Sequence, residues 1–131
     1  MLRKAFNLAA VLFLFSALLV GCGGPGPEKA AQSALEATVS GDFKTASDNF
    51  CKKMLDEMPP QELIDEIAKE LKQYEFDFSG LKYEVVEEKG DSATVHVSGT
   101  IKAKGPDDEK TDDMDEKISM VKEDGQWKVC E

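Results

Sequence analysis

The spacing of apolar residues changes partway along the chain. Between Glu28 and Tyr74, apolar residues recur every three or four positions, which is typical of amphipathic helices. From Phe76 onward, apolar and polar residues alternate, which is typical of strands with one buried face. Helices followed by an antiparallel meander predict a single α+β domain over residues 28–131.

The apolar spacing predicts three helices: one at about residues 28–40, one after Asp42 through about Leu55, and one after Pro59-Pro60 through about Tyr74. Pro27 has the fixed backbone angle that suits the first turn of a helix. Gly41 is expected to end the first helix, and Asp42 is expected to cap the second. The pair Pro59-Pro60 separates the second helix from the third, because proline cannot continue a helical hydrogen-bond ladder.

The alternating half of the chain predicts four strands, beginning at Phe76, covering 92–104 and 116–122, and ending with 126–130. Turns are expected at Lys89-Gly90-Asp91 and at Glu123-Asp124-Gly125. The acidic residues 105–115 are expected to form a loop between the second and third strands.

The N-terminus has the pattern of a targeting signal. Arg3 and Lys4 precede an apolar stretch from Leu8 to Val20, so residues 1–21 are predicted to be a signal peptide. A membrane-spanning helix is the weaker interpretation, because a span needs about 20 apolar residues. The stretch is shorter and runs directly into a segment rich in glycine and proline.

Residues Leu19-Val20-Gly21-Cys22 resemble the lipobox of bacterial lipoproteins. The resemblance implies a lipid on Cys22, a flexible tether over residues 22–27, and a domain anchored in the cell envelope, facing the periplasm or the exterior. Gly23 after the cysteine implies the outer membrane in a Gram-negative cell. The alternative is an ordinary secretory signal with an incidental cysteine.

The net charge of the predicted mature domain limits the classes of partner that it can bind. The whole chain has 16 basic and 26 acidic residues, and cleavage after Gly21 removes only Arg3 and Lys4 among them. The remaining formal charge of −12 argues against binding to nucleic acid or to an anionic lipid surface, which both require clusters of lysine and arginine.

Two cysteines remain beyond Cys22. Exported proteins meet an oxidising compartment, so Cys51 and Cys130 are predicted to form a disulfide. A redox-active or metal-binding pair is the weaker alternative, because the sequence has no Cys-x-x-Cys spacing and no histidine near either cysteine.

Three short motifs resemble the nuclear transport factor 2-like superfamily, including small lipoproteins of that kind. They are Pro27-Glu28-Lys29-Ala30-Ala31, Gly41-Asp42-Phe43-Lys44-Thr45-Ala46 and Glu123-Asp124-Gly125-Gln126-Trp127-Lys128-Val129. The resemblance implies N-terminal helices packed on a curved antiparallel sheet, a cone-shaped fold of the nuclear transport factor 2-like or cystatin-like kind. In some members the mouth of the cone is a ligand pocket or active site, and members often pair through their sheets, so a homodimer is possible.

The same resemblance suggests candidate pocket residues of acid-base type: Tyr74, Asp77, Tyr83 and His96. None of them lies in a recognisable catalytic motif, and a solvated histidine on a strand is the commoner case, so we assign no catalytic residue. The acidic cluster between Asp107 and Glu116 lacks the alternating ligands and central glycine of a calcium loop. We therefore expect neither a metal site nor a cofactor.

These observations predict a membrane-tethered envelope lipoprotein that acts as a non-enzymatic module and binds a small ligand or an envelope protein. The alternative is a small isomerase-like or hydrolase-like enzyme with its active site in the cone. A ligand-binding domain should contain an enclosed apolar pocket with a few polar groups. A protein-binding domain should have a filled cone and an exposed apolar patch.

Overall fold

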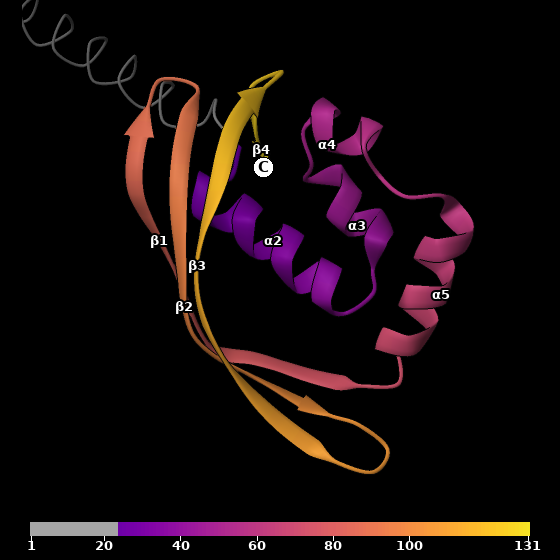
Figure 1. The fold of residues 1–131 in the computed structure, drawn as a ribbon. Coiled ribbons are helices and arrows are strands. Elements are labelled where there is room, and N and C mark those ends of the chain that lie inside the picture. The colour runs from indigo at the N-terminus through magenta and orange to yellow at the C-terminus, as the bar shows by residue number, and fades with distance from the viewer. Residues whose placement is uncertain (1–23) are drawn as a thin grey trace, which may run out of the picture.

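The computed structural model describes residues 24–131 and has four helices followed by four strands (Figure 1). Their bounds are α2 (Pro27–Val39), α3 (Phe43–Asp48), α4 (Lys52–Asp56), α5 (Gln61–Leu71), β1 (Glu75–Lys89), β2 (Ser92–Lys104), β3 (Glu109–Glu123) and β4 (Gln126–Val129). The strands pair antiparallel in the order β1-β2-β3-β4. The predicted α+β class is confirmed.

The sheet is bent, and α2 lies across its concave side (Figure 1). Alternation along β2 sends Ala93, Val95 and Val97 to this side, where all three are buried. The opposite, convex side of β2 has Thr94, His96 and Ser98, which are only partly buried. The alternation seen in the sequence therefore separates the core from a polar outer face.

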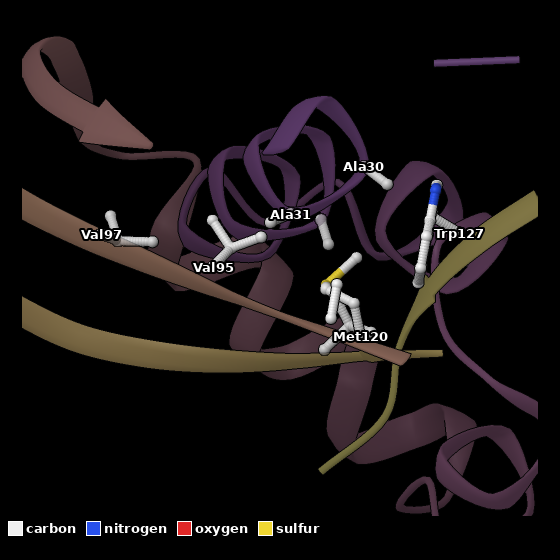
Figure 2. Packing of buried hydrophobic residues seen from close by; sticks show 9 residues of the cluster. Ala30, Ala31, Val95, Val97, Met120 and Trp127 are labelled. Carbon is white, nitrogen blue, oxygen red and sulfur yellow. The ribbon is translucent and has the colours of Figure 1, made fainter. Parts of the chain in front are cut away.

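Alanines allow α2 to approach the sheet closely. Ala30, Ala31 and Ala34 of α2 are buried in one cluster with Val95, Val97, Met120, Trp127 and other side chains of the sheet. Figure 2 shows Met120 and Val95 directed from the strands toward Ala31 on the helix. The interior of the curved sheet is thus occupied by α2.

Two glycines approach each other at the centre of the long β1-β2 hairpin. The register shifts between Asp77 and Gly80 of β1, which marks a β-bulge, and Gly99 of β2 lies opposite Leu81. Gly99 has φ of +117°, and a Cβ added there would overlap the carbonyl oxygen of Gly80. Bulges and glycine kinks bend sheets, so this pair accounts for the curvature around α2.

The predicted second helix is divided in two. It breaks at Asn49–Cys51, where the chain pairs with β4 instead of continuing the helical ladder: Cys51 N donates to Val129 O at 2.8 Å, and Val129 N donates to Asn49 O at 2.7 Å. Phe50 and Val129 form a parallel bridge. The prediction of one continuous helix is wrong because this segment gains partners on the edge of the sheet.

The acidic segment is a strand for most of its length. Residues 105–115 were expected to be a loop, yet β3 begins at Glu109 and pairs with β2 as far as Lys104. The segment lacks apolar alternation because much of its length is exposed on both faces. Backbone pairing holds it in place, with Glu109 opposite Lys104 and Lys110 opposite Ala103.

The third helix ends earlier than expected, at Leu71. Tyr74 N donates to Leu71 O at 3.1 Å in the turn that leads into β1.

The predicted signal peptide, the lipobox and the lipid site at Cys22 lie outside the described residues. Within residues 24–131, no helix is long and apolar enough to cross a membrane.

Candidate functional site

A hollow lies on the concave side beside the packed α2. It has a volume of about 230 Å³ and lies between α2, the α3–α4 segment and strands β3 and β4. Its lining residues are Ala34, Leu35, Thr38, Phe50, Met54, Ile118, Val129 and Glu131. We refer to this hollow as the apolar pocket.

Each wall of the apolar pocket has a local structural cause. Leu35 and Thr38 lie one turn apart on α2 and therefore share a face. Phe50 is positioned by its parallel bridge to Val129. Met54 follows on α4, where its sulfur accepts a hydrogen bond from the backbone N–H of Glu131 at 3.4 Å.

The polar groups of the pocket are already engaged. The hydroxyl of Thr38 donates to the carbonyl of Ala34 at 2.7 Å. Oε1 of Glu131 accepts from the backbone N–H of Ser119 at 3.1 Å. Because the only ionisable lining side chain is Glu131, the pocket has no paired acid and base and suits an apolar group.

Tyr83 faces the concave side, because its partner across the hairpin is the buried Val97. Its hydroxyl donates to Oε1 of Glu36 on α2 at 3.4 Å. Burial, and secondarily the negative charge of Glu36, raises the pKa of Tyr83 well above its usual value. The Tyr83 hydroxyl is therefore held as a hydrogen-bond donor to Glu36.

His96 lies on the convex side, because its neighbours Val95 and Val97 face the core. Its Nε2 is 2.6 Å from Oδ1 of Asp115, which is largely exposed. This histidine–carboxylate pair resembles part of a catalytic triad. The cross-strand neighbours of His96 are Glu84 and Lys117, and Ser98, which lies opposite Asp115 on the same face, is not hydrogen-bonded to the histidine in this structure.

Asp77 also faces outward, opposite Lys102. Hydrogen bonds from Ser79, whose backbone N–H donates to Oδ1 at 2.9 Å, lower the pKa of Asp77. Tyr74 lies before β1, with its ring centroid 6.2 Å from that of Phe76. The four residues suggested by the resemblance are thus divided between two faces of the sheet and the α5–β1 turn, and they form no common site.

Sequence reasoning did not identify the lining of the apolar pocket. Leu35, Met54 and Ile118 lie in segments that were predicted as helix or strand, and no pocket was predicted at them. The local sequence has no signal that distinguishes them, because the pocket depends on contacts between segments far apart in the chain.

Residues 24–131 contain no cluster of three or more side chains able to hold a metal ion.

The two sulfurs of Cys51 and Cys130 are bonded, with the Cα atoms 5.3 Å apart. The bond joins the start of α4 to the residue after β4, beside the apolar pocket. It therefore fixes Met54 and Glu131, which follow these cysteines closely in the chain, relative to each other.

Residues 30–131 match the family model described as the C-terminal domain of anti-sigma-I factor RsgI9. No curated protein matches the chain. This family match corrects the function predicted from the sequence. A membrane-tethered envelope lipoprotein is the wrong description, because the matched family is a domain of a regulatory protein.

Two solved structures have a similar arrangement. RPA3114, a SEC-C motif containing protein from Rhodopseudomonas palustris, has a TM-score of 0.56 and 20% identity, over 80% of this chain and 75% of its own. The association domain of C. elegans CaMKII has a TM-score of 0.49 and 17% identity, over 77% of this chain and 85% of its own. The likeness to RPA3114 extends to the fold alone.

Proposed function

The chain belongs to the family of the C-terminal domain of anti-sigma-I factor RsgI9, and we propose that its folded domain is a non-catalytic regulatory module that binds a segment of a partner protein. The observation that carries this proposal is the apolar pocket. Six of its eight lining residues are apolar, and the Thr38 hydroxyl and Oε1 of Glu131 make hydrogen bonds within the domain.

The size of the pocket favours a protein partner over a free small molecule. Ligand pockets usually enclose about 300–1,000 Å³, whereas this one has about 230 Å³. The space between helix and sheet that holds ligands in a hollow cone is filled here by Ala30, Ala31 and Ala34. A shallow apolar pocket suits one large apolar side chain of a partner, the kind of anchor that dominates protein interfaces.

Two further proposals concern the setting of the domain. The helices before the sheet, the four-stranded meander and the seat of α2 in the concave side support the nuclear transport factor 2-like assignment. The bond between Cys51 and Cys130 supports a location in an oxidising compartment, since disulfides are rare in the reducing cytosol.

Filling the pocket should abolish partner binding. We expect Met54→Trp to weaken binding of selected peptides by about tenfold or more, because the indole occupies the space of the incoming anchor. The test selects peptides from a phage-displayed random library on the purified protein and measures their affinity by calorimetry. A purified sigma-I factor, the kind of partner that the name anti-sigma-I factor implies, serves as a second, defined probe.

The matched control is Val86→Trp, which places the same side chain on β1 at a position that is already exposed. It should leave peptide affinity unchanged. Equal loss in both variants, or failure of both the library and the sigma-I factor to yield any binder, would contradict the proposed function. Selected peptides should also be enriched in large apolar residues.

A further inference from the structure

Helix α5 has an apolar face that the rest of the domain covers only at its C-terminal end, where the ring of Tyr74 packs near Phe76 and Gly105. Six large hydrophobic side chains are exposed within residues 24–131, and three of them lie on α5 or in the turn after it: Leu63, Ile67 and Tyr74. Leu63 and Ile67 are 46% and 38% exposed, and four residues apart on the helix. We call these three residues the α5 apolar stripe.

The other side of α5 holds the helix to the domain. Ile64 is buried, and Ala68 and Leu71 meet the backbone at Gly41, where an added Cβ would lie 3.1 Å from the carbonyl oxygen of Ala68 and from Cβ of Leu71. Figure 1 shows α5 at the edge of the domain, far from the turn between β1 and β2 and on the side where the hairpin of β2 and β3 ends. Leu63 and Ile67 are therefore not needed to seat the helix.

The charged residues beside Leu63 and Ile67 on α5 are acidic. Residues three or four apart are neighbours on a helix surface, which places Glu66 beside Leu63 and Glu70 beside Ile67. Lys69 and Lys72 stand at neither spacing from any stripe residue. Among the ion pairs of residues 24–131, none uses Glu66 or Glu70.

We propose that the α5 apolar stripe, bordered by Glu66 and Glu70, is a docking surface for a basic amphipathic segment of the partner protein. Apolar side chains of that segment cover Leu63 and Ile67, and its lysines or arginines meet the two carboxylates. The proposal rests on the proposed function, since it takes a protein segment as the partner, and it adds the chemistry of that segment.

A second copy of this chain is a poor occupant. Arg3 and Lys4 are the only charged residues before residue 24, so the described part has a formal charge of −12. Two such domains repel each other, and pairing through a shared α5 face would bring Glu66 and Glu70 of both copies together. A cationic partner gains attraction from the same charges.

The test uses the purified protein and an amphipathic helical peptide of leucine and lysine, with a leucine–glutamate peptide as the negative probe. Calorimetry should show binding of the leucine–lysine (Leu-Lys) peptide and no binding of the leucine–glutamate peptide. The double variant Glu66→Lys/Glu70→Lys should weaken that binding by about tenfold. Lysine keeps the helix propensity of glutamate, so α5 remains folded.

Two controls separate the stripe from general attraction between acidic protein and basic peptide. Glu87→Lys/Glu88→Lys makes the same change in net charge at the end of β1, and it should change affinity by less than about twofold. Ile67→Ser should weaken binding about as much as the α5 charge reversal, whereas Val86→Ser should not. Equal effects of the two charge reversals, or no binding of the Leu-Lys peptide, overturn the α5 docking surface.

The two proposals fail in different ways. If Met54→Trp blocks the library peptides while the α5 variants leave the Leu-Lys peptide unaffected, the α5 surface is wrong and the regulatory binding function stands. If the α5 variants weaken the Leu-Lys peptide but no library peptide or sigma-I factor depends on Met54, the apolar pocket is not the anchor site and the proposed function fails in its stated form.

Discussion

Replacing Cys51 and Cys130 together by alanine is expected to lower the free energy of unfolding by about 4 kcal/mol. The bond closes a loop with a sequence separation of 79 residues, so it removes much of the conformational freedom of the unfolded chain. Since a domain of this size has a net stability of roughly 5–15 kcal/mol, the variant should be only marginally folded. Urea unfolding followed by tryptophan fluorescence reports the change, because Trp127 is buried beside this region.

The reduced wild-type protein is the matched control. Reductant should bring the wild type close to the double alanine variant and should leave that variant unchanged. In the folded state, the backbone hydrogen bond from Cys51 N to Val129 O also holds the start of α4 against β4. The reduced wild type and the double alanine variant are both expected to keep this hydrogen bond. A change below about 1 kcal/mol in the double variant would mean that these backbone contacts hold α4 on the sheet without the covalent bond.

Where a segment is buried on one face only, the sequence predicted it well. The alternation around Val95 and Val97 predicted a strand at 92–104, and β2 has those bounds. The first helix was predicted to within one residue at each end, because its small apolar residues recur with the helical period. In both segments burial and local geometry follow the same pattern, so the pattern alone is sufficient.

Where pairing replaces burial, periodicity gives no signal. The acidic part of β3 extends beyond the cover of α2, so its side chains are exposed and its strand structure comes from the backbone ladder with β2. The break at Asn49–Cys51 likewise depends on β4, more than 70 residues later. The apolar pocket combines both difficulties, since Leu35, Met54 and Ile118 meet only in the folded domain.

The candidate pocket residues failed for a related reason. Tyr83 and His96 are chemically suited to acid-base work, but strand parity places them on opposite faces of the sheet. The register of β1 against β2 shifts twice, so parity along β1 cannot be counted through from one end. The sequence shows which residues have acid-base side chains, but it does not show toward which face of the sheet each side chain points.

Substituting Gly99 by alanine is expected to destabilise the domain by at least about 3 kcal/mol. Two costs combine at this position. The backbone has φ of +117°, a conformation that residues with a Cβ rarely adopt, and the new Cβ would overlap the carbonyl oxygen of Gly80 on the paired strand. The new Cβ is bonded directly to the backbone and the Gly80 oxygen is part of it, so neither atom can rotate away. We therefore expect β1 and β2 to separate at the bend.

Gly90→Ala provides the matched control, because Gly90 also has positive φ, at +56°, but its added Cβ meets nothing within 4 Å. The free energy of unfolding of this variant should fall only by the cost of placing a residue with a Cβ at positive φ, about 1–2 kcal/mol. Urea unfolding of both variants gives the difference, and circular dichroism shows whether the Gly99 variant keeps its strands. If the two glycines prove equally tolerant, the close approach of Gly80 and Gly99 does not hold the bend, and the seat of α2 in the concave side must have another cause.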